Sequence, residues 1–121
     1  MAQPIVFFDI VGTELPGQAA FYKAIFDWDS GPGGELSVPV VSPLMGVLRT
    51  EAERPEGVAE RVLYVGVPEI NVTLAAIVAH GGAVVVPRLE VEGVAVIGLF
   101  TDPAGNRMGL VELDGEHAKI P

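Results

Sequence analysis

The stretch that decides the fold is GLFTDPAGNRMGLVE, at residues 98–112, in which two apolar runs flank a tight turn. The apolar runs predict two strands. Asp102 can accept hydrogen bonds from backbone N–H groups two and three residues further on, and Pro103 fixes φ. Gly105 and Asn106 tolerate positive φ. We therefore expect a hairpin that positions the last strand and takes no part in chemistry.

The sequence around this hairpin predicts one strand, one helix and then three strands in the second half of the chain. The strands are apolar runs bounded by turn residues. The helix has apolar residues at helical spacing, such as Leu74, Ile77 and Val78, and it ends at the Gly81–Gly82 pair. The four strands are expected at residues 61–67, 83–91, 93–101 and 106–114.

The first half of the chain is interpreted in the same order, a strand and a helix followed by strands, of which two after the helix can be given a range. Residues 5–11 form an apolar run typical of a buried strand. Apolar residues from Leu15 to Phe26 recur at steps of four, three and four, which predicts a helix with Pro16 in its first turn. Two further strands are expected at residues 35–41 and 42–50.

The two halves correspond residue by residue. A shift of 55 places Glu14 on Glu69, and a shift of 63 places residues 44–48 on residues 107–111. The matching order and the matching ends favour internal duplication over chance similarity of two amphipathic stretches. We therefore divide a single domain, residues 1–121, into four parts. These are a first module at 4–50, a charged linker at 51–60, a second module at 61–113 and a tail at 114–121.

The composition of the chain excludes several functional classes. It has no cysteine and two histidines, which rules out disulfide scaffolds and cysteine-ligated metal sites. Sixteen acidic against seven basic residues give a net charge of −9, which argues against nucleic acid and anionic membranes as partners. No apolar run is long enough to span a membrane, and the N-terminus lacks signal-peptide features, so we expect a cytoplasmic protein.

Three motifs together resemble the vicinal-oxygen-chelate superfamily, which includes glyoxalases, extradiol dioxygenases and bleomycin-resistance proteins. They are the strand-turn-helix stretch at residues 7–29, the second strand-helix unit at 64–82, and the DPxGN turn within 98–112. The resemblance covers essentially the whole chain. It implies an α+β fold in which two βαβββ modules form a curved eight-stranded sheet, with a cup inside and the helices outside.

The resemblance also implies where a metal ion would bind, because metal-dependent members take ligands from the first and last strand of each module. Those positions correspond to Phe7, Gly46, Val62 and Gly109. None of these side chains can ligate a divalent metal ion. We therefore expect no metal or other cofactor, and no glyoxalase, dioxygenase or epimerase activity of the metal-dependent kind. The two glycines would leave room where the metal ion would sit.

Other candidate metal ligands are expected outside the cup. His80 ends the second helix, and His117 lies in a tail that is expected to fray, so both should be surface residues. Glu112 lies three residues after Gly109 and therefore on the opposite face of its strand. We expect it to be a solvent or interface carboxylate.

Strand alternation predicts which side chains line the cup and could bind a ligand. They are Phe7, Asp9, Gly46, Leu48, Val62, Tyr64, Arg107, Gly109 and Val111. An apolar cavity with few polar groups is the usual character of a small-molecule site. Asp9 could meet a cationic ligand, act as a general base, or pair with Arg107 in a purely structural role.

Three functions follow from this pattern. The first is metal-independent binding of a small organic molecule, with a cationic ligand fitting the acidic chain. The second is a metal-free enzyme in which Asp9 and Tyr64, with Arg107, transfer a proton on a bound substrate. The third is a non-catalytic dimerisation domain with a filled cup. The apolar excess and the resemblance together predict a homodimer, with Phe21 and Trp28 in the core or at the dimer contact.

Overall fold

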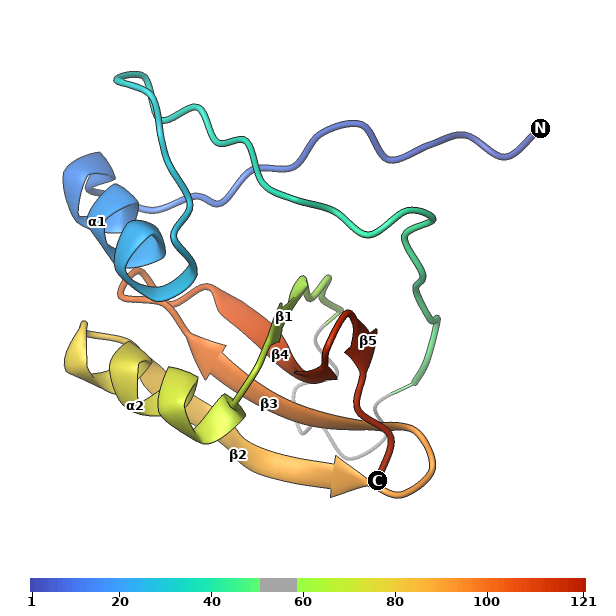
Figure 1. Cartoon of the computed structure of the whole chain (residues 1–121). Helices are drawn as coiled ribbons and strands as arrows, with labels where there is room; N and C mark the ends of the chain where they lie inside the picture. Colours follow the sequence, from blue (N-terminus) through green and yellow to red (C-terminus); the bar gives the residue numbers. More distant parts are fainter. Residues whose placement is uncertain (51–58) are drawn as a thin grey trace.

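The computed structural model describes residues 1–50 and 59–121 and has an α+β architecture (Figure 1). Residues 51–58, within the predicted linker, lie outside the described residues. There are two helices, α1 (Leu15–Phe26) and α2 (Ile70–Ala79). The strands are β1 (Tyr64–Val67), β2 (Ala83–Val91), β3 (Ala95–Thr101), β4 (Arg107–Asp114) and β5 (His117–Ala118).

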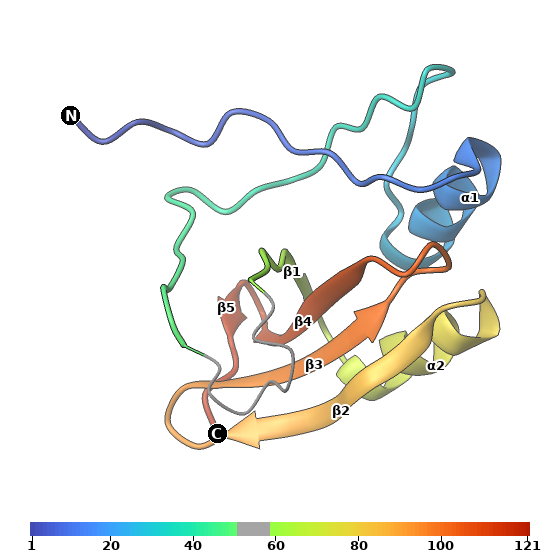
Figure 2. The same ribbon diagram turned by 180° about the vertical axis from the view of Figure 1, so that it is seen from behind.

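One sheet is built entirely from the second half of the chain. Its strand order is β1-β4-β3-β2, with β1 parallel to β4 and the other neighbours antiparallel. Helix α2 connects β1 to β2 and packs on one face of the sheet (Figures 1 and 2). The strand, helix and three-strand order predicted for the second half is confirmed, and β2 has the predicted bounds.

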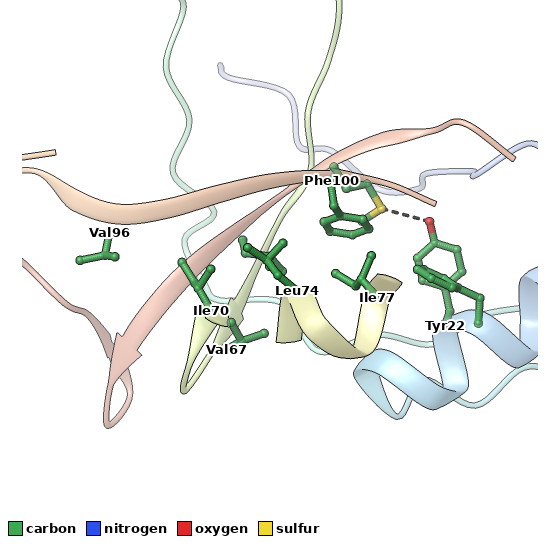
Figure 3. Packing of buried hydrophobic residues seen from close by; sticks show 10 residues of the cluster. Tyr22, Val67, Ile70, Leu74, Ile77, Val96 and Phe100 are labelled. Carbon is green, nitrogen blue, oxygen red and sulfur yellow. Dashed lines mark hydrogen bonds between the residues drawn. The ribbon is translucent and has the colours of Figure 1, made fainter. Parts of the chain in front are cut away.

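The core lies between this sheet and the two helices. Its fully buried side chains come from α2 and from strands β3 and β4: Ile70, Ile77, Val96, Phe100 and Leu110. Phe21 and Tyr22 of α1 join the same cluster, and Figure 3 shows Tyr22 beside Ile77 and Phe100. Trp28 stacks on Tyr22, so the predicted core role of Phe21 and Trp28 is confirmed. The burial of these apolar side chains joins the first half of the chain to the second.

The two helices begin in the same way, as the internal repeat predicts. Their N-cap residues are Glu14 and Glu69, which lie 55 residues apart in the sequence. Both have extended backbones, with φ/ψ of −144/101° and −144/107°. Pro16 stands in the first turn of α1, where its missing N–H costs no hydrogen bond. The expected helix over residues 15–26 is therefore confirmed.

The strands predicted in the first half are wrong for this structure. Residues 5–11, 35–41 and 42–50 belong to no strand, and the nearest approach to one is an isolated bridge between Ser30 and Leu36. Five strands are present among the described residues, and the expected eight-stranded sheet is not formed. An apolar run becomes a strand only when a neighbour takes up its backbone hydrogen bonds, and the sequence pattern does not supply that neighbour.

The tail is also more ordered than predicted. Strand β5 pairs with β4, and Lys119 donates its backbone N–H to the carbonyl of Glu112 at 2.9 Å. The carbonyl of Pro121 accepts a bond of 3.1 Å from the N–H of Gly93. The expected fraying of residues 114–121 is therefore wrong, because backbone hydrogen bonds hold the tail to the sheet. None of the helices in the described residues has the length and apolarity to cross a membrane.

Candidate functional site

One face of the sheet is turned away from α2, and we call it the cup face. On β4, Met108, Leu110 and Glu112 point toward the helices and are buried. Alternation along the strand therefore places Arg107, Gly109 and Val111 on the cup face. Val67 of β1 is in the core, so Tyr64 lies on the cup face as well, opposite Gly109 in the parallel register.

The ring of Tyr64 lies directly against Gly109. A Cβ atom built on Gly109 would overlap the Cδ2 and Cε2 atoms of this ring. The glycine therefore allows close approach of an aromatic ring, and the space expected where a metal ion would sit is filled there by Tyr64. The Tyr64 side chain remains 43% exposed, so its other face is open to a ligand. Gly46, in contrast, has no neighbouring atom within 4 Å of such a Cβ.

This close approach predicts the effect of a single methyl group. We expect Gly109→Ala to lower the free energy of unfolding by about 1–3 kcal/mol, because the added Cβ displaces the Tyr64 ring. The matched control is Gly46→Ala, for which we expect a change within about 0.5 kcal/mol. Urea denaturation measures both, and adding Tyr64→Ala should remove most of the cost at residue 109. Equal effects of the two glycine substitutions would contradict this packing.

Arg107 lies at one end of the cup face and is paired with a residue that the sequence did not indicate. Its Nε atom lies 3.7 Å from Oε2 of Glu60, so the ion pair considered between Arg107 and Asp9 is replaced by one with Glu60. The Nε–H is buried and has no hydrogen-bond partner among the described residues. An unpaired buried donor is costly, and a ligand oxygen could accept its hydrogen bond.

The first-half candidates are not gathered on the cup face. Phe7 is 84% exposed and Leu48 is fully exposed, and both lie on extended segments outside the sheet. Asp9 and Gly46 are exposed on the same segments, and Asp9 forms no hydrogen bond or ion pair with any described residue. Val62 is half-buried and lies just before β1. The structure therefore brings Tyr64, Arg107, Gly109 and Val111 together but does not add Asp9 to them.

A buried network that the sequence did not predict joins the DPxGN turn to α1. Oδ2 of Asp102 accepts a 2.7 Å hydrogen bond from the hydroxyl of Tyr22, and Asp102 is only 2% exposed. Its Oδ1 accepts from the backbone N–H groups of Ala104 and Asn106, which lie two and four residues further on. The Asn106 amide donates to Asp102 and also to the carbonyl of Val11.

The turn therefore does more than the expected hairpin, because it ties the first half of the chain to the second. Gly105 has the expected positive φ of 95°, but Asn106 contributes through its side chain and has no positive φ. Burial and the adjacent Asp102 carboxylate raise the pKa of Tyr22 above its ordinary value of 10. The DPxGN turn and the α1 helix motif are each visible in the sequence. The hydrogen bond between Tyr22 and Asp102 joins residues 80 positions apart, so it leaves no local signal.

Glu112 differs from its predicted role as a solvent or interface carboxylate. It is only 6% exposed, and it accepts hydrogen bonds from Nε and Nη2 of Arg88 at 3.1 and 2.8 Å. It also accepts the backbone N–H of Ile70, at the start of α2. The Arg88 hydrogen bonds, followed by that from Ile70, lower the pKa of Glu112 from 4.5 to about 2. Glu112 lies on the predicted face of β4, opposite Gly109. Its carboxylate is buried there rather than exposed, because it neutralises Arg88 and caps the start of α2.

Both histidines lie at the surface, as predicted. His80 is the exposed C-cap residue of α2, and its Nδ1 lies 2.8 Å from the carbonyl oxygen of Ala76. His117 is exposed in β5. Among residues 1–50 and 59–121, no three histidine, aspartate or glutamate side chains come together as a metal-ligand group.

Two cavities lie near α1, away from the predicted ligand residues. One, of about 320 Å³, is bounded by the start of α1, by His80 and by the turn at Pro103 and Ala104. The other, of about 50 Å³, lies between α1, Ile10 and Leu36. None of the predicted cup residues lines either cavity.

No known sequence family and no curated protein matches the chain. Several solved structures do match, among them a glyoxalase-related enzyme from Fulvimarina pelagi, at a TM-score of 0.65. That match is 14% identical in sequence and covers 99% of this chain and 98% of that chain. The chain has the glyoxalase/bleomycin resistance fold.

Two further structures share this glyoxalase/bleomycin resistance fold. A hypothetical protein from S. aureus is 20% identical, with a TM-score of 0.62, and the match covers 93% of this chain and 95% of that one. A glyoxalase/bleomycin resistance protein/dioxygenase family enzyme from Burkholderia phytofirmans is 12% identical, with a TM-score of 0.60, and the coverage is 84% and 91%. At these identities the likeness establishes the fold and leaves the activity open.

Proposed function

We propose that the protein binds a small organic molecule on the cup face, without a metal ion. The observation that carries this proposal is the combination of the exposed Tyr64 ring on Gly109 with the buried Nε–H of Arg107, which donates no hydrogen bond to any described residue although it is ion-paired with Glu60. An apolar and aromatic surface with few placed polar groups is typical of small-molecule sites. Val111 is half-buried on the same face and adds apolar surface.

The charges of the protein favour some ligand classes over others. The Nε–H of Arg107, which makes no hydrogen bond with the described residues, is suited to an acceptor oxygen such as that of an amide or a ketone. A net charge of −9 attracts cations and repels anions at long range. We therefore propose a ligand that has an apolar body and a neutral oxygen acceptor, and that carries a positive charge or none.

A ligand series of constant shape tests this proposal. Its members are 4-(aminomethyl)benzamide, 4-methylbenzamide and 4-carboxybenzamide, which share an amide oxygen and differ in charge at the far end. We expect binding to weaken in that order, with amide ¹⁵N–¹H shifts at Tyr64, Gly109 and Val111 in NMR titrations. Shifts confined to the cavity beside His80, or no saturable shifts, would contradict binding on the cup face.

A variant at residue 107 tests the role of its donor. We expect Arg107→Met to weaken binding of 4-methylbenzamide about tenfold, as the loss of one hydrogen bond predicts. The matched control is Arg61→Met, because Arg61 is exposed and its side chain takes part in no hydrogen bond or ion pair with the described residues. Equal effects of the two substitutions would contradict the proposed contact.

Metal content tests the other half of the proposal. The positions that the resemblance assigns to metal ligands hold Phe7, Gly46, Val62 and Gly109, whose side chains have no donor atom. We expect the purified protein to contain far less than one equivalent of nickel, zinc, iron or manganese by elemental analysis. About one equivalent of any of these metals would contradict metal independence.

A further inference from the structure

We infer that a cavity between the start of α1, the end of α2 and the turn from β3 to β4 binds a small organic cation with several N–H donors, such as an alkylguanidinium ion. We call it the junction cavity. It has a volume of about 320 Å³, and it is lined by Thr13, Glu14, Gln18 and His80, with Pro103 and Ala104. None of the described residues that line it lies on the cup face, so this second site does not depend on the proposed function.

The walls of the junction cavity come from both halves of the chain. In both views the turn from β3 to β4 lies between α1 and the end of α2 (Figures 1 and 2). Small-molecule sites have volumes of about 300–1,000 Å³, so the cavity is large enough for a small organic ligand. Its position outside the sheet separates it from the face that carries Tyr64 and Gly109.

Hydrogen bonds and close packing fix these walls. The buried network around Asp102 joins the turn to α1, and Oδ1 of Asp102 also accepts the N–H of Ala104 at 3.0 Å. A Cβ atom built on Gly81, just after α2, would lie 3.6 Å from Cγ of Pro103, so the end of the helix packs on the turn. A ligand would therefore meet a preformed site, which lowers the entropy cost of binding.

The polar side chains of the cavity offer oxygen acceptors that the protein leaves unused. Glu14 forms no ion pair with a described residue, and only its Oε1 accepts a hydrogen bond, from the N–H of Gly17 at 3.2 Å. The amide of half-buried Gln18 and the hydroxyl of Thr13 make no hydrogen bond within residues 1–50 and 59–121. Carboxylate, amide and hydroxyl oxygens are therefore open to the donors of a ligand.

His80 adds a nitrogen acceptor to this set. Its Nδ1 lies 2.8 Å from the carbonyl oxygen of Ala76, and because a carbonyl can only accept, Nδ1 is the donor. In the neutral ring Nε2 is then an acceptor, and it has no partner in the part of the chain that the structure describes. The ring also stands at the C-terminal end of α2, where the helix dipole favours a positive charge.

The charges around the cavity favour a cation over an anion. No lysine or arginine is among the described residues that line it. The N-terminus of α1 would attract an anion, but the Glu14 carboxylate already accepts the N–H of Gly17 there and repels a second negative charge. A guanidinium ion presents its N–H donors as a planar fork, which suits several separate acceptors around one cavity. Pro103 and Ala104 offer apolar contact to an aliphatic stem.

A pair of probes with the same shape tests the inference on the full chain. N-butylguanidinium and N-butylurea share a planar head group and a butyl stem, but the urea is neutral and has an oxygen in place of one nitrogen donor. We expect N-butylguanidinium to cause saturable amide ¹⁵N–¹H shifts at Gly17, Gln18 and Ala104 in NMR titrations. N-butylurea should bind at least tenfold more weakly, because it lacks the charge-assisted hydrogen bond.

Variants at the cavity test which side chains hold the cation. Glu14→Gln keeps the shape and an oxygen for the N–H of Gly17 but removes the charge, and we expect it to weaken binding of N-butylguanidinium at least tenfold. The matched control is Glu69→Gln, because Glu69 is the exposed N-cap of α2 and makes no side-chain capping bond. It should change the affinity less than twofold. His80→Phe keeps a planar ring but removes Nε2, and we expect about threefold weaker binding.

Four results would contradict the inference. Equal affinities of the two probes would show that the cavity does not select a charge. Equal effects of Glu14→Gln and Glu69→Gln would show attraction by the overall charge alone. Shifts confined to Tyr64, Gly109 and Val111 would place the cation on the cup face, and a lack of saturable shifts would exclude binding. The benzamide series is monitored at the amides of the cup face, so its binding there can succeed or fail separately.

Discussion

Replacement of Asp102 by alanine is expected to lower the free energy of unfolding by about 3 kcal/mol, because it removes the acceptor at the centre of a buried network. The buried hydroxyl of Tyr22 loses its carboxylate acceptor and is left with the weaker acceptor Sδ of Met108, 3.2 Å away. Asn106 loses two bonds that fix the turn. Urea denaturation followed by the fluorescence of Trp28 measures this loss, since the indole stacks on Tyr22.

Two further variants show whether the network itself is responsible. Tyr22→Phe keeps the ring but removes one donor to the carboxylate, and we expect a loss of about 1 kcal/mol. Asp114→Ala changes an exposed carboxylate at the end of β4 and should alter stability by less than about 0.5 kcal/mol. A loss for Asp102→Ala no larger than that for Asp114→Ala would contradict the contribution of the network.

Replacement of Glu112 by alanine should have an effect of similar size, about 3 kcal/mol. It leaves the side chain of Arg88 with only the exposed Glu90, and it removes the acceptor of the Ile70 N–H. Glu112→Gln keeps the shape and an acceptor oxygen but removes the charge, so we expect a smaller loss. The matched control is Glu116→Gln, which changes an exposed carboxylate in the turn before β5. Equal stabilities of the residue 112 variants and this control would contradict a stabilising ion pair.

The same carboxylate predicts how stability depends on pH. The pKa of Glu112 is about 2 in the folded protein, against an ordinary value of 4.5, so the unfolded chain binds its proton more readily. The stabilisation is present in full above pH 4.5 and is lost as the pH falls toward 2. As the pH is lowered across this window, the midpoint temperature of thermal unfolding should therefore fall more steeply for the wild type than for Glu112→Gln. Parallel curves would contradict the lowered pKa.

The sequence predicts most where the evidence for an element is local. Helix α1 and the strands of the second half follow from apolar spacing and turn residues within each segment. Strand alternation also predicts which side chains share the cup face, because it depends only on the positions of residues along each strand. These residues are Tyr64, Arg107, Gly109 and Val111.

What the sequence could not supply is the identity of distant partners. An apolar run such as residues 5–11 has strand character, but the hydrogen bonds that would make it a strand depend on another segment. Alternation places Glu112 on the helix side but gives no sign that Arg88, 24 residues away on β2, neutralises it there. The contact of Tyr64 with Gly109 is of the same kind, because only the parallel pairing of β1 with β4 brings the two together.

The starts of the two helices depend on different parts of the chain. Glu14 closes the first turn of α1 with its own side chain, which accepts the N–H of Gly17 only three residues on. Glu69 makes no such bond, and the N–H of Ile70 goes instead to Glu112, 42 residues away. One helix can therefore nucleate from its own sequence, whereas the other is completed at its start only when the last long strand has joined the sheet. Helix α2 and strand β4 should accordingly gain and lose their order as one cooperative unit.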